Sequence, residues 1–388
     1  MSSPARPRAS FSSRRQRPRY DASGALSTGF DVVRARLRNQ LLSGGGLKKP
    51  DDVVRWMGAV QAQEYTDTKW ALALRMRQAT DATIERAFAS GAILRTHVLR
   101  PTWHFVTPAD IRWMLSLTGP RVNAAMATYN RRLELDAAVF RKSERLIAEA
   151  LRGGAQLTRQ EIKAVLKRGG IQPDGAQRLA HIVMQAELDG LICSGARRDK
   201  QFTYALLDER APAVPVLSRD QALAELTRRY FTSHGPAQLQ DFAWWSGLTV
   251  TDARAGLEMV ASTLTRETVD GRTYWLSSST PTMRSPSHVA ALLPLYDEYL
   301  IAYKDRSAAL NPARWNPSVA RDSFMAPIVV EGKVIGGWKR AVKNKRLEIS
   351  LRPFVRLAGA AQRAVTASAH AYAEFFGVDS AITSLPSP

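Results

Sequence analysis

The sequence predicts an α+β fold built from several small units. Amphipathic helical stretches followed by a β-hairpin occur three times, in the same order, between residues 30 and 277. From residue 286 the pattern changes to short β-rich runs, and a helical stretch over 357–376 follows them. These observations predict three helix-and-hairpin units, then a small antiparallel β-sheet or barrel and a terminal helix.

The first unit is predicted from three helical stretches and one hairpin. A helix over 32–42 ends at a run of three glycines, Asp51 or Asp52 caps a second, and Thr80 caps a third. Alternating apolar residues on both sides of Leu99-Arg100-Pro101 predict two strands joined there.

The second and third units repeat this order. Thr158 and Glu161 have the spacing of a helix capping box, and a basic hairpin tip follows at 195–200. In the third unit, Asp270-Gly271 is a typical two-residue hairpin turn. Helices followed by a basic hairpin are typical of winged-helix domains, whose relatives place a helix in the DNA major groove. A helical bundle with incidental loops is the alternative.

The expected division of the chain follows from these boundaries. We expect a disordered basic arm over 1–25, winged helices over 26–120, 121–210 and 211–285, and a β domain with its helix over 286–388.

The charge of the chain points to a polyanionic partner. The net charge is +20, and six arginines in the first twenty residues leave +14 for the remainder once they are subtracted. A charge of this size over folded sequence predicts binding to nucleic acid, although solubility alone is the other explanation.

Several classes of protein are disfavoured by composition. Cys193 is the single cysteine, so no disulfide framework, cysteine-based zinc site or iron–sulfur cluster is expected. The apolar run over 289–295 is too short to span a membrane. We expect a reducing compartment, the bacterial cytosol near the nucleoid, with no membrane contact, metal or cofactor.

One short polar motif lies where the second helix should end. In Gln61-Ala62-Gln63 the two amides are about 200° apart on a helix but on one side of an extended chain. Both glutamines can therefore serve one site only if the helix stops near residues 60–62. From spacing alone, a role in satisfying nearby backbone groups is the favoured alternative.

Two further segments combine polar and charged side chains. Around Trp103, the first hairpin gathers Arg95, His97, Thr102 and His104, which supply cations beside an aromatic surface; a solvated strand face is the alternative. A second segment, from Asp297-Glu298 to Arg306, mixes acids and bases, and internal salt bridges are an equally good explanation. We assign Trp244-Trp245 to the core.

Together these residues resemble a known family. The runs Val60-Gln61-Ala62-Gln63-Glu64-Tyr65, Lys69-Trp70-Ala71-Leu72 and Arg95-Thr96…Arg100…Thr102…His104 resemble the AlkZ/YcaQ-type winged-helix DNA glycosylases. Tyr296-Asp297-Glu298-Tyr299-Leu300 and Val334-Ile335-Gly336-Gly337-Trp338 resemble its C-terminal signatures. Pro101 and Thr66 depart from the family, in which a glycine and a proline are usual at the corresponding places.

The resemblance implies a fold and an activity. Members combine three winged helices with a β-barrel around DNA and excise N7-alkylated guanines; some unhook interstrand crosslinks, and some confer self-resistance to alkylating antibiotics. We therefore expect a monofunctional, monomeric glycosylase acting on duplex DNA that carries alkylated guanine. The rival hypotheses are a non-catalytic winged-helix transcriptional regulator and a degenerate scaffold.

The expected site residues fall into three groups. By the resemblance, Gln61 and Gln63 are catalytic. A supporting carboxylate is expected from Asp297 or Glu298, with Glu64 as a further alternative. The predicted DNA-binding residues are Lys69, Arg95, His97, Arg100, Thr102, His104, Arg197, Arg198, Lys200 and Arg306.

Overall fold

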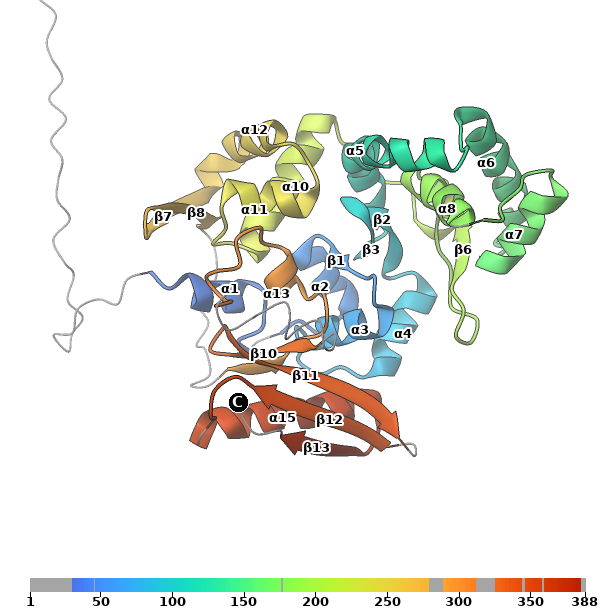
Figure 1. Cartoon of the computed structure of the whole chain (residues 1–388). Helices are drawn as coiled ribbons and strands as arrows, with labels where there is room; N and C mark the ends of the chain where they lie inside the picture. The colour runs from blue at the N-terminus through green and yellow to red at the C-terminus, as the bar shows by residue number, and fades with distance from the viewer. Residues whose placement is uncertain are drawn as a thin grey trace, which may run out of the picture. The chain divides into compact units, whose positions relative to one another are not determined.

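The computed structural model describes residues 30–44, 46–175, 177–278, 289–311, 325–343, 346–357 and 359–384. Val32–Pro388 forms one compact unit, and most of its elements are labelled in Figure 1. The arm predicted over 1–25 lies outside the described residues. The α+β class is confirmed by helices that alternate with small sheets.

The first segment, residues 32–106, contains four helices and a three-stranded sheet of order β1-β3-β2. Its elements are α1 (Val32–Asn39), α2 (Pro50–Met57), β1 (Val60–Gln61), α3 (Tyr65–Ala73), α4 (Asp81–Ser90), β2 (Leu94–Val98) and β3 (Arg100–Val106). Thr80 caps α4 as predicted, by accepting the Thr83 N–H. The predicted cap of α2 at Asp51 or Asp52 is wrong, because Pro50 already occupies the first turn and favours helix initiation.

The second segment, residues 111–210, begins with a long helix that the sequence patterns did not predict. Its elements are α5 (Ile111–Arg132), α6 (Ala137–Leu151), β4 (Leu157–Thr158), α7 (Arg159–Arg168), α8 (Arg178–Leu188), β5 (Ile192–Ser194), β6 (Thr203–Leu206) and α9 (Leu207–Arg210). The capping box of Thr158 and Glu161 is confirmed at the start of α7. Because α5 continues through Pro120, the boundary expected at 120/121 falls inside a helix.

The third segment, residues 219–277, follows its predicted pattern closely. It contains α10 (Arg219–Ser233), α11 (Leu239–Ser246), α12 (Val250–Val260), a 3-10 turn (Ala261–Thr263), β7 (Leu264–Val269) and β8 (Arg272–Ser277). The β7–β8 turn has φ of 48° at Asp270 and 73° at Gly271, as the Asp-Gly hairpin signal predicts.

The C-terminal segment, residues 290–384, forms a curled, open sheet of order β13-β12-β11-β10-β9. Its elements are β9 (Ala290–Leu292), α13 (Glu298–Ile301), β10 (Ala326–Val330), β11 (Lys333–Lys343), β12 (Arg346–Pro353), α15 (Gly359–Phe376) and β13 (Ser380–Ser384). The predicted antiparallel sheet is found in β9 to β12, and the predicted helix follows as α15. The sequence did not predict β13, which follows α15 and pairs with β12 in parallel, with the helix as the crossover that a parallel pair needs.

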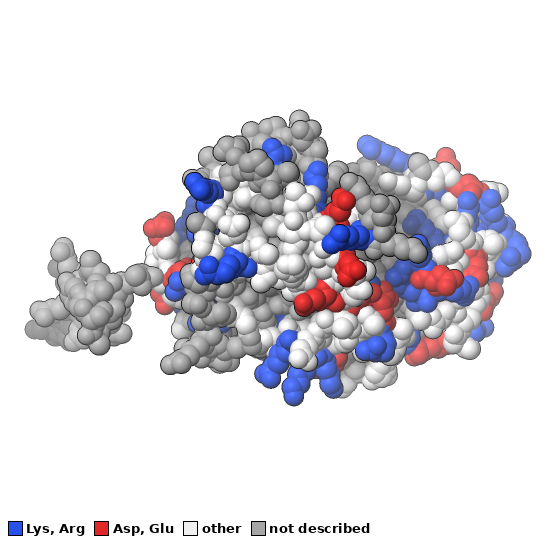
Figure 2. Space-filling model, turned by 90° about the horizontal axis from the view of Figure 1, so that it is seen from below, with Lys and Arg blue, Asp and Glu red and all other residues white. Residues whose placement is uncertain are grey.

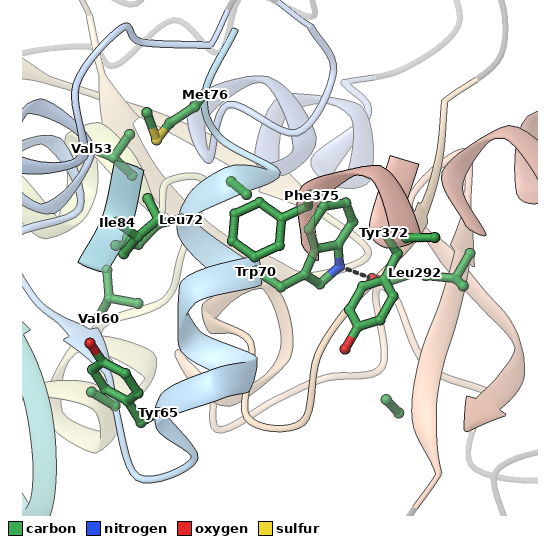
Figure 3. Packing of buried hydrophobic residues seen from close by; sticks show 14 of the residues in the cluster. Val53, Val60, Tyr65, Trp70, Leu72, Met76, Ile84, Leu292, Tyr372 and Phe375 are labelled. Carbon is green, nitrogen blue, oxygen red and sulfur yellow. Dashed lines mark hydrogen bonds between the residues drawn. The ribbon is translucent and has the colours of Figure 1, made fainter. Parts of the chain in front are cut away.

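The first and C-terminal segments share one hydrophobic core, which fixes their relative position. Trp70 of α3 packs edge-on against Tyr372 and next to Phe375 of α15, with ring centroids 5.2 and 5.6 Å away. The Trp70 indole N–H donates to the Leu292 carbonyl oxygen of β9 at 2.7 Å (Figure 3). A second core joins β2 and β3 to α5, α10 and α11, so the small first sheet lies between the other segments.

Candidate functional site

The Gln-x-Gln motif lies on extended chain, as a shared site for both amides requires. Helix α2 ends at Met57 because Gly58 adopts φ of 80°, a value that favours glycine. The chain then pairs with β3, placing Gln61 opposite His104. Gln63 lies just beyond, in the bend before α3, and both glutamine side chains are half-buried. The helix therefore stops before the motif.

Gln61 is held at both its backbone and its side chain. Its backbone N–H donates to Glu298 Oε1 at 2.7 Å, and the Thr68 hydroxyl lies 3.0 Å from its carbonyl oxygen. Arg100 Nη2 donates to Gln61 Oε1 at 3.1 Å. Since a guanidinium has no acceptor, this contact orients the amide oxygen toward Arg100.

Glu298 provides a buried negative charge next to the backbone of the motif. Its Oε1 accepts the Gln61 N–H and its Oε2 accepts the Trp245 indole N–H at 3.0 Å, while the His234 ring is 3.8 Å away, beyond hydrogen-bond length. Burial opposes ionisation, but His234, Arg100 and the Gln61 N–H outweigh it and lower the pKa of Glu298 to about 2. The carboxylate is therefore ionised at neutral pH.

The three carboxylates suggested by the sequence have different surroundings. Both oxygens of Asp297 are bound by Arg75, at 2.8 and 2.9 Å, and the Asp297 side chain also caps α13. Glu64 is exposed. Glu298 is thus the carboxylate that directly contacts the Gln61 backbone.

His104 is a neutral, buried neighbour of Gln61. Burial, reinforced by the charge of Arg100, lowers its pKa to about 3. Its Nδ1 lies 2.9 Å from the Thr102 carbonyl oxygen and must donate to it, which leaves Nε2 as an acceptor. Within the described chain this Nε2 is buried without a hydrogen-bond partner.

Several predicted DNA-binding residues have internal partners. Lys69 is buried between Asp81 at 2.5 Å and Glu85 at 2.6 Å. His97 is buried against Glu187 at 2.5 Å. These contacts occupy the polar atoms that we expected to meet phosphate, so we do not retain Lys69 and His97 among the proposed contacts.

The remaining predicted contacts differ in exposure. Arg95 is buried, whereas Thr102, Arg197 and Arg306 are half-buried and Arg198 and Lys200 are exposed. Arg197 pairs with Glu85 at 3.1 Å and Arg198 with Glu161 at 2.8 Å. On the face drawn in Figure 2, basic side chains are interspersed with acidic ones.

The two tryptophans of α11 are the residues that sequence reasoning missed. Trp245 is buried as predicted, but it also binds Glu298. The core assignment of Trp244 is wrong, because 47% of it is exposed; its indole N–H donates to the Ile301 carbonyl oxygen and its own carbonyl oxygen lies 3.5 Å from Arg100 Nη1. The sequence signal that could have indicated their role is the pair Trp244-Trp245 at the end of a helix.

Metal-binding clusters and membrane-spanning helices are both absent from the described residues. Among them, no group of three or more histidine, cysteine, aspartate or glutamate side chains is arranged to hold a metal ion. None of the described helices combines the length and apolarity that a membrane span requires.

Comparisons with known proteins agree with the resemblance noted in the sequence. The chain is 23% identical over 320 residues to an interstrand DNA cross-link repair glycosylase of Streptomyces sahachiroi, covering 78% of this chain and 85% of that protein. The solved structure of the Streptomyces sahachiroi DNA glycosylase AlkZ has the same fold, with a TM-score of 0.73 and 22% identity, covering 93% of this chain and all of that one. The family model described as DNA glycosylase AlkZ-like matches residues 54–375. The chain therefore belongs to the AlkZ-like DNA glycosylase family.

Proposed function

We propose that this protein excises N7-alkylated guanine from duplex DNA by hydrolysis of the N-glycosidic bond, with Gln61 and Gln63 as catalytic residues. The observation that carries the proposal is the setting of Gln61, whose backbone contacts an ionised, buried Glu298 and whose amide is oriented by Arg100. A preorganised amide beside a fixed charge is suited to a reaction in which charge develops on the substrate.

The chemistry of the lesion explains why amides suffice. An N7-alkylguanine already carries a positive charge, so it leaves without protonation by a strong general acid. The remaining requirements are stabilisation of an oxocarbenium-like deoxyribose and placement of a water molecule. The amide oxygen of Gln61 has two lone pairs, of which Arg100 uses one, and the other is available to hold that water.

Gln63 and Glu298 have complementary roles in this proposal. Gln63, in the bend after β1, supplies the second amide to the water or the sugar. Glu298 remains behind Gln61, where its negative charge favours the cationic sugar without acting as a base. Its two N–H donors, from Gln61 and Trp245, fix it in place.

DNA binding is assigned to basic side chains of the first, second and C-terminal segments, and we propose that the three helix-and-hairpin segments are winged helices. We retain Arg95, Arg100, Arg197, Arg198, Lys200 and Arg306 as phosphate contacts, and Thr102 and His104 as groups next to the bound strand. The monomer would act on chromosomal DNA in the cytosol. Unhooking of crosslinks joined through guanine N7 is the extension suggested by the name of the Streptomyces sahachiroi relative.

The test is direct detection of base release. A duplex containing N7-methylguanine, and a second duplex crosslinked through two guanine N7 atoms, are incubated with the protein. We expect free N7-methylguanine and heat-labile abasic sites, with no strand break before heating because we propose a monofunctional enzyme. A protein that binds both duplexes but releases no base from either would instead be a DNA-binding regulator or scaffold.

A further inference from the structure

A basic pocket lies between the first and second segments. It has a volume of about 500 Å³ and is lined by residues from β2, β3, α7 and the β5–β6 hairpin. Its lining includes Arg95, Trp103, Arg159, Lys200, Phe202 and Tyr204. Three of these are cations, and the described lining contains no carboxylate.

Arg95 is a rigid and nearly buried cation in this lining. Only 7% of it is exposed, and its guanidinium carbon lies 4.2 Å from the Trp103 ring centroid and 4.5 Å from that of Phe202. Its Nε donates to the Ala62 carbonyl oxygen at 2.9 Å. In the described chain its two Nη groups have no acceptor and no carboxylate within salt-bridge distance, so they are available to a ligand. Burial of an uncompensated charge is costly, and an anion in the pocket would offset that cost.

Three further groups of the pocket are hydrogen-bond donors or cations. The Trp103 indole N–H is buried without a hydrogen-bond partner among the described residues. Arg159 begins α7, a ten-residue helix whose N-terminal N–H groups and dipole favour anions. Lys200 is exposed at the rim. Converging N–H donors and cations match a ligand with several anionic oxygens.

We propose that this pocket binds a backbone phosphate of the DNA strand that carries the excised base. The proposal rests on the function proposed above and adds a phosphate subsite to it. Arg95 supplies the connection, because it binds the carbonyl oxygen of Ala62, the residue between the two catalytic glutamines. A phosphate held here positions its strand relative to the motif, and the aromatic walls of Trp103, Phe202 and Tyr204 pack on the adjoining deoxyribose.

The first experiment measures the salt dependence of binding to undamaged duplex DNA, which requires no base excision. The pocket variant is Arg159→Ala/Lys200→Ala, in which buried Arg95 is kept. The control is Lys142→Ala/Arg168→Ala, which removes the same charge from exposed positions on α6 and at the far end of α7. Loss of one phosphate contact should make the negative slope of log affinity against log salt shallower by about 0.9. Between 50 and 200 mM salt, the pocket variant should therefore lose roughly 3-fold less affinity than the wild type.

A slope for the pocket variant equal to that of the control overturns the proposal. Inorganic phosphate is titrated in parallel: if it binds the pocket while the DNA slope of the pocket variant matches the control, the site takes free phosphate and its assignment to DNA is wrong.

A second experiment locates the phosphate with neutral methylphosphonates placed one at a time around a single N7-methylguanine. One position should slow excision by the wild type at limiting protein but leave the pocket variant unaffected, and a uniform response at all positions contradicts the proposal. Absence of base release by the wild type refutes the proposed function. The salt experiment on undamaged DNA still tests whether the pocket binds a DNA phosphate.

Discussion

Replacement of Glu298 by glutamine tests the buried carboxylate on which the site is built. The carboxylate accepts one N–H on each oxygen, from Gln61 and from Trp245. A glutamine of the same shape places an NH₂ group against one of these donors. The variant therefore loses a charge-assisted hydrogen bond and leaves a buried N–H without an acceptor.

The size of the effect follows from the ionisation of Glu298. Lowering its pKa from the ordinary 4.5 to about 2 corresponds to about 3 kcal/mol of folding free energy. Because the folded-state pKa is the lower one, this contribution is complete above pH 4.5 and is lost as the pH falls toward 2. The glutamine variant has no such contribution at any pH, so the difference between the two proteins should shrink in acid.

Urea unfolding at pH 7 and at pH 3.5 measures both the loss of stability and its dependence on pH. We expect the free energy of unfolding of Glu298→Gln to be about 3 kcal/mol below the wild type at pH 7, with a smaller gap at pH 3.5. Glu64→Gln, at an exposed position next to the motif, is the matched control and should be neutral. A variant as stable as the wild type, or a gap that does not change with pH, would refute the reasoning.

Three further outcomes are expected. The rate of base release should vary little between pH 6 and pH 9, because Glu298 stays ionised and His104 stays neutral throughout; a bell-shaped profile in single-turnover measurements contradicts this. Arg100→Ala should slow base release about tenfold or more at saturating protein, because the Gln61 amide loses its charged donor; an effect on affinity alone would contradict it. Lys69→Met should lower the free energy of unfolding by about 2 kcal/mol but leave the affinity for DNA unchanged, because its two carboxylate partners are internal. Calorimetry measures the stability, and fluorescence anisotropy measures the affinity for DNA.

The parts of the fold that were predicted correctly depend on local rules. The turn at Asp270-Gly271, the Thr80 cap and the Thr158 capping box each satisfy backbone groups within a few residues. The end of α2 before the Gln-x-Gln motif is also local, because it depends on Gly58.

The failures have long-range causes. Helix α5 continues through Pro120 because tertiary packing against α8 and α10 outweighs the local cost of proline. The parallel β12–β13 pair depends on a connection across the whole of α15. Glu298 is 237 residues from Gln61 in the chain, and no periodicity connects them. The sequence therefore offered Glu298 as one of three candidate carboxylates, but its contact with Gln61 could be found only in the structure.

The catalytic assignment is tested most directly by single-turnover release of N7-methylguanine from duplex DNA. The variants are Gln61→Ala and Gln63→Ala, with Gln172→Ala, an exposed glutamine of the second segment, as the matched control. Loss of one preorganised polar group should lower the rate about 10²- to 10³-fold while DNA affinity and thermal stability stay close to wild type. If the double variant Gln61→Ala/Gln63→Ala releases the base at nearly the wild-type rate, the two glutamines are not the catalytic residues.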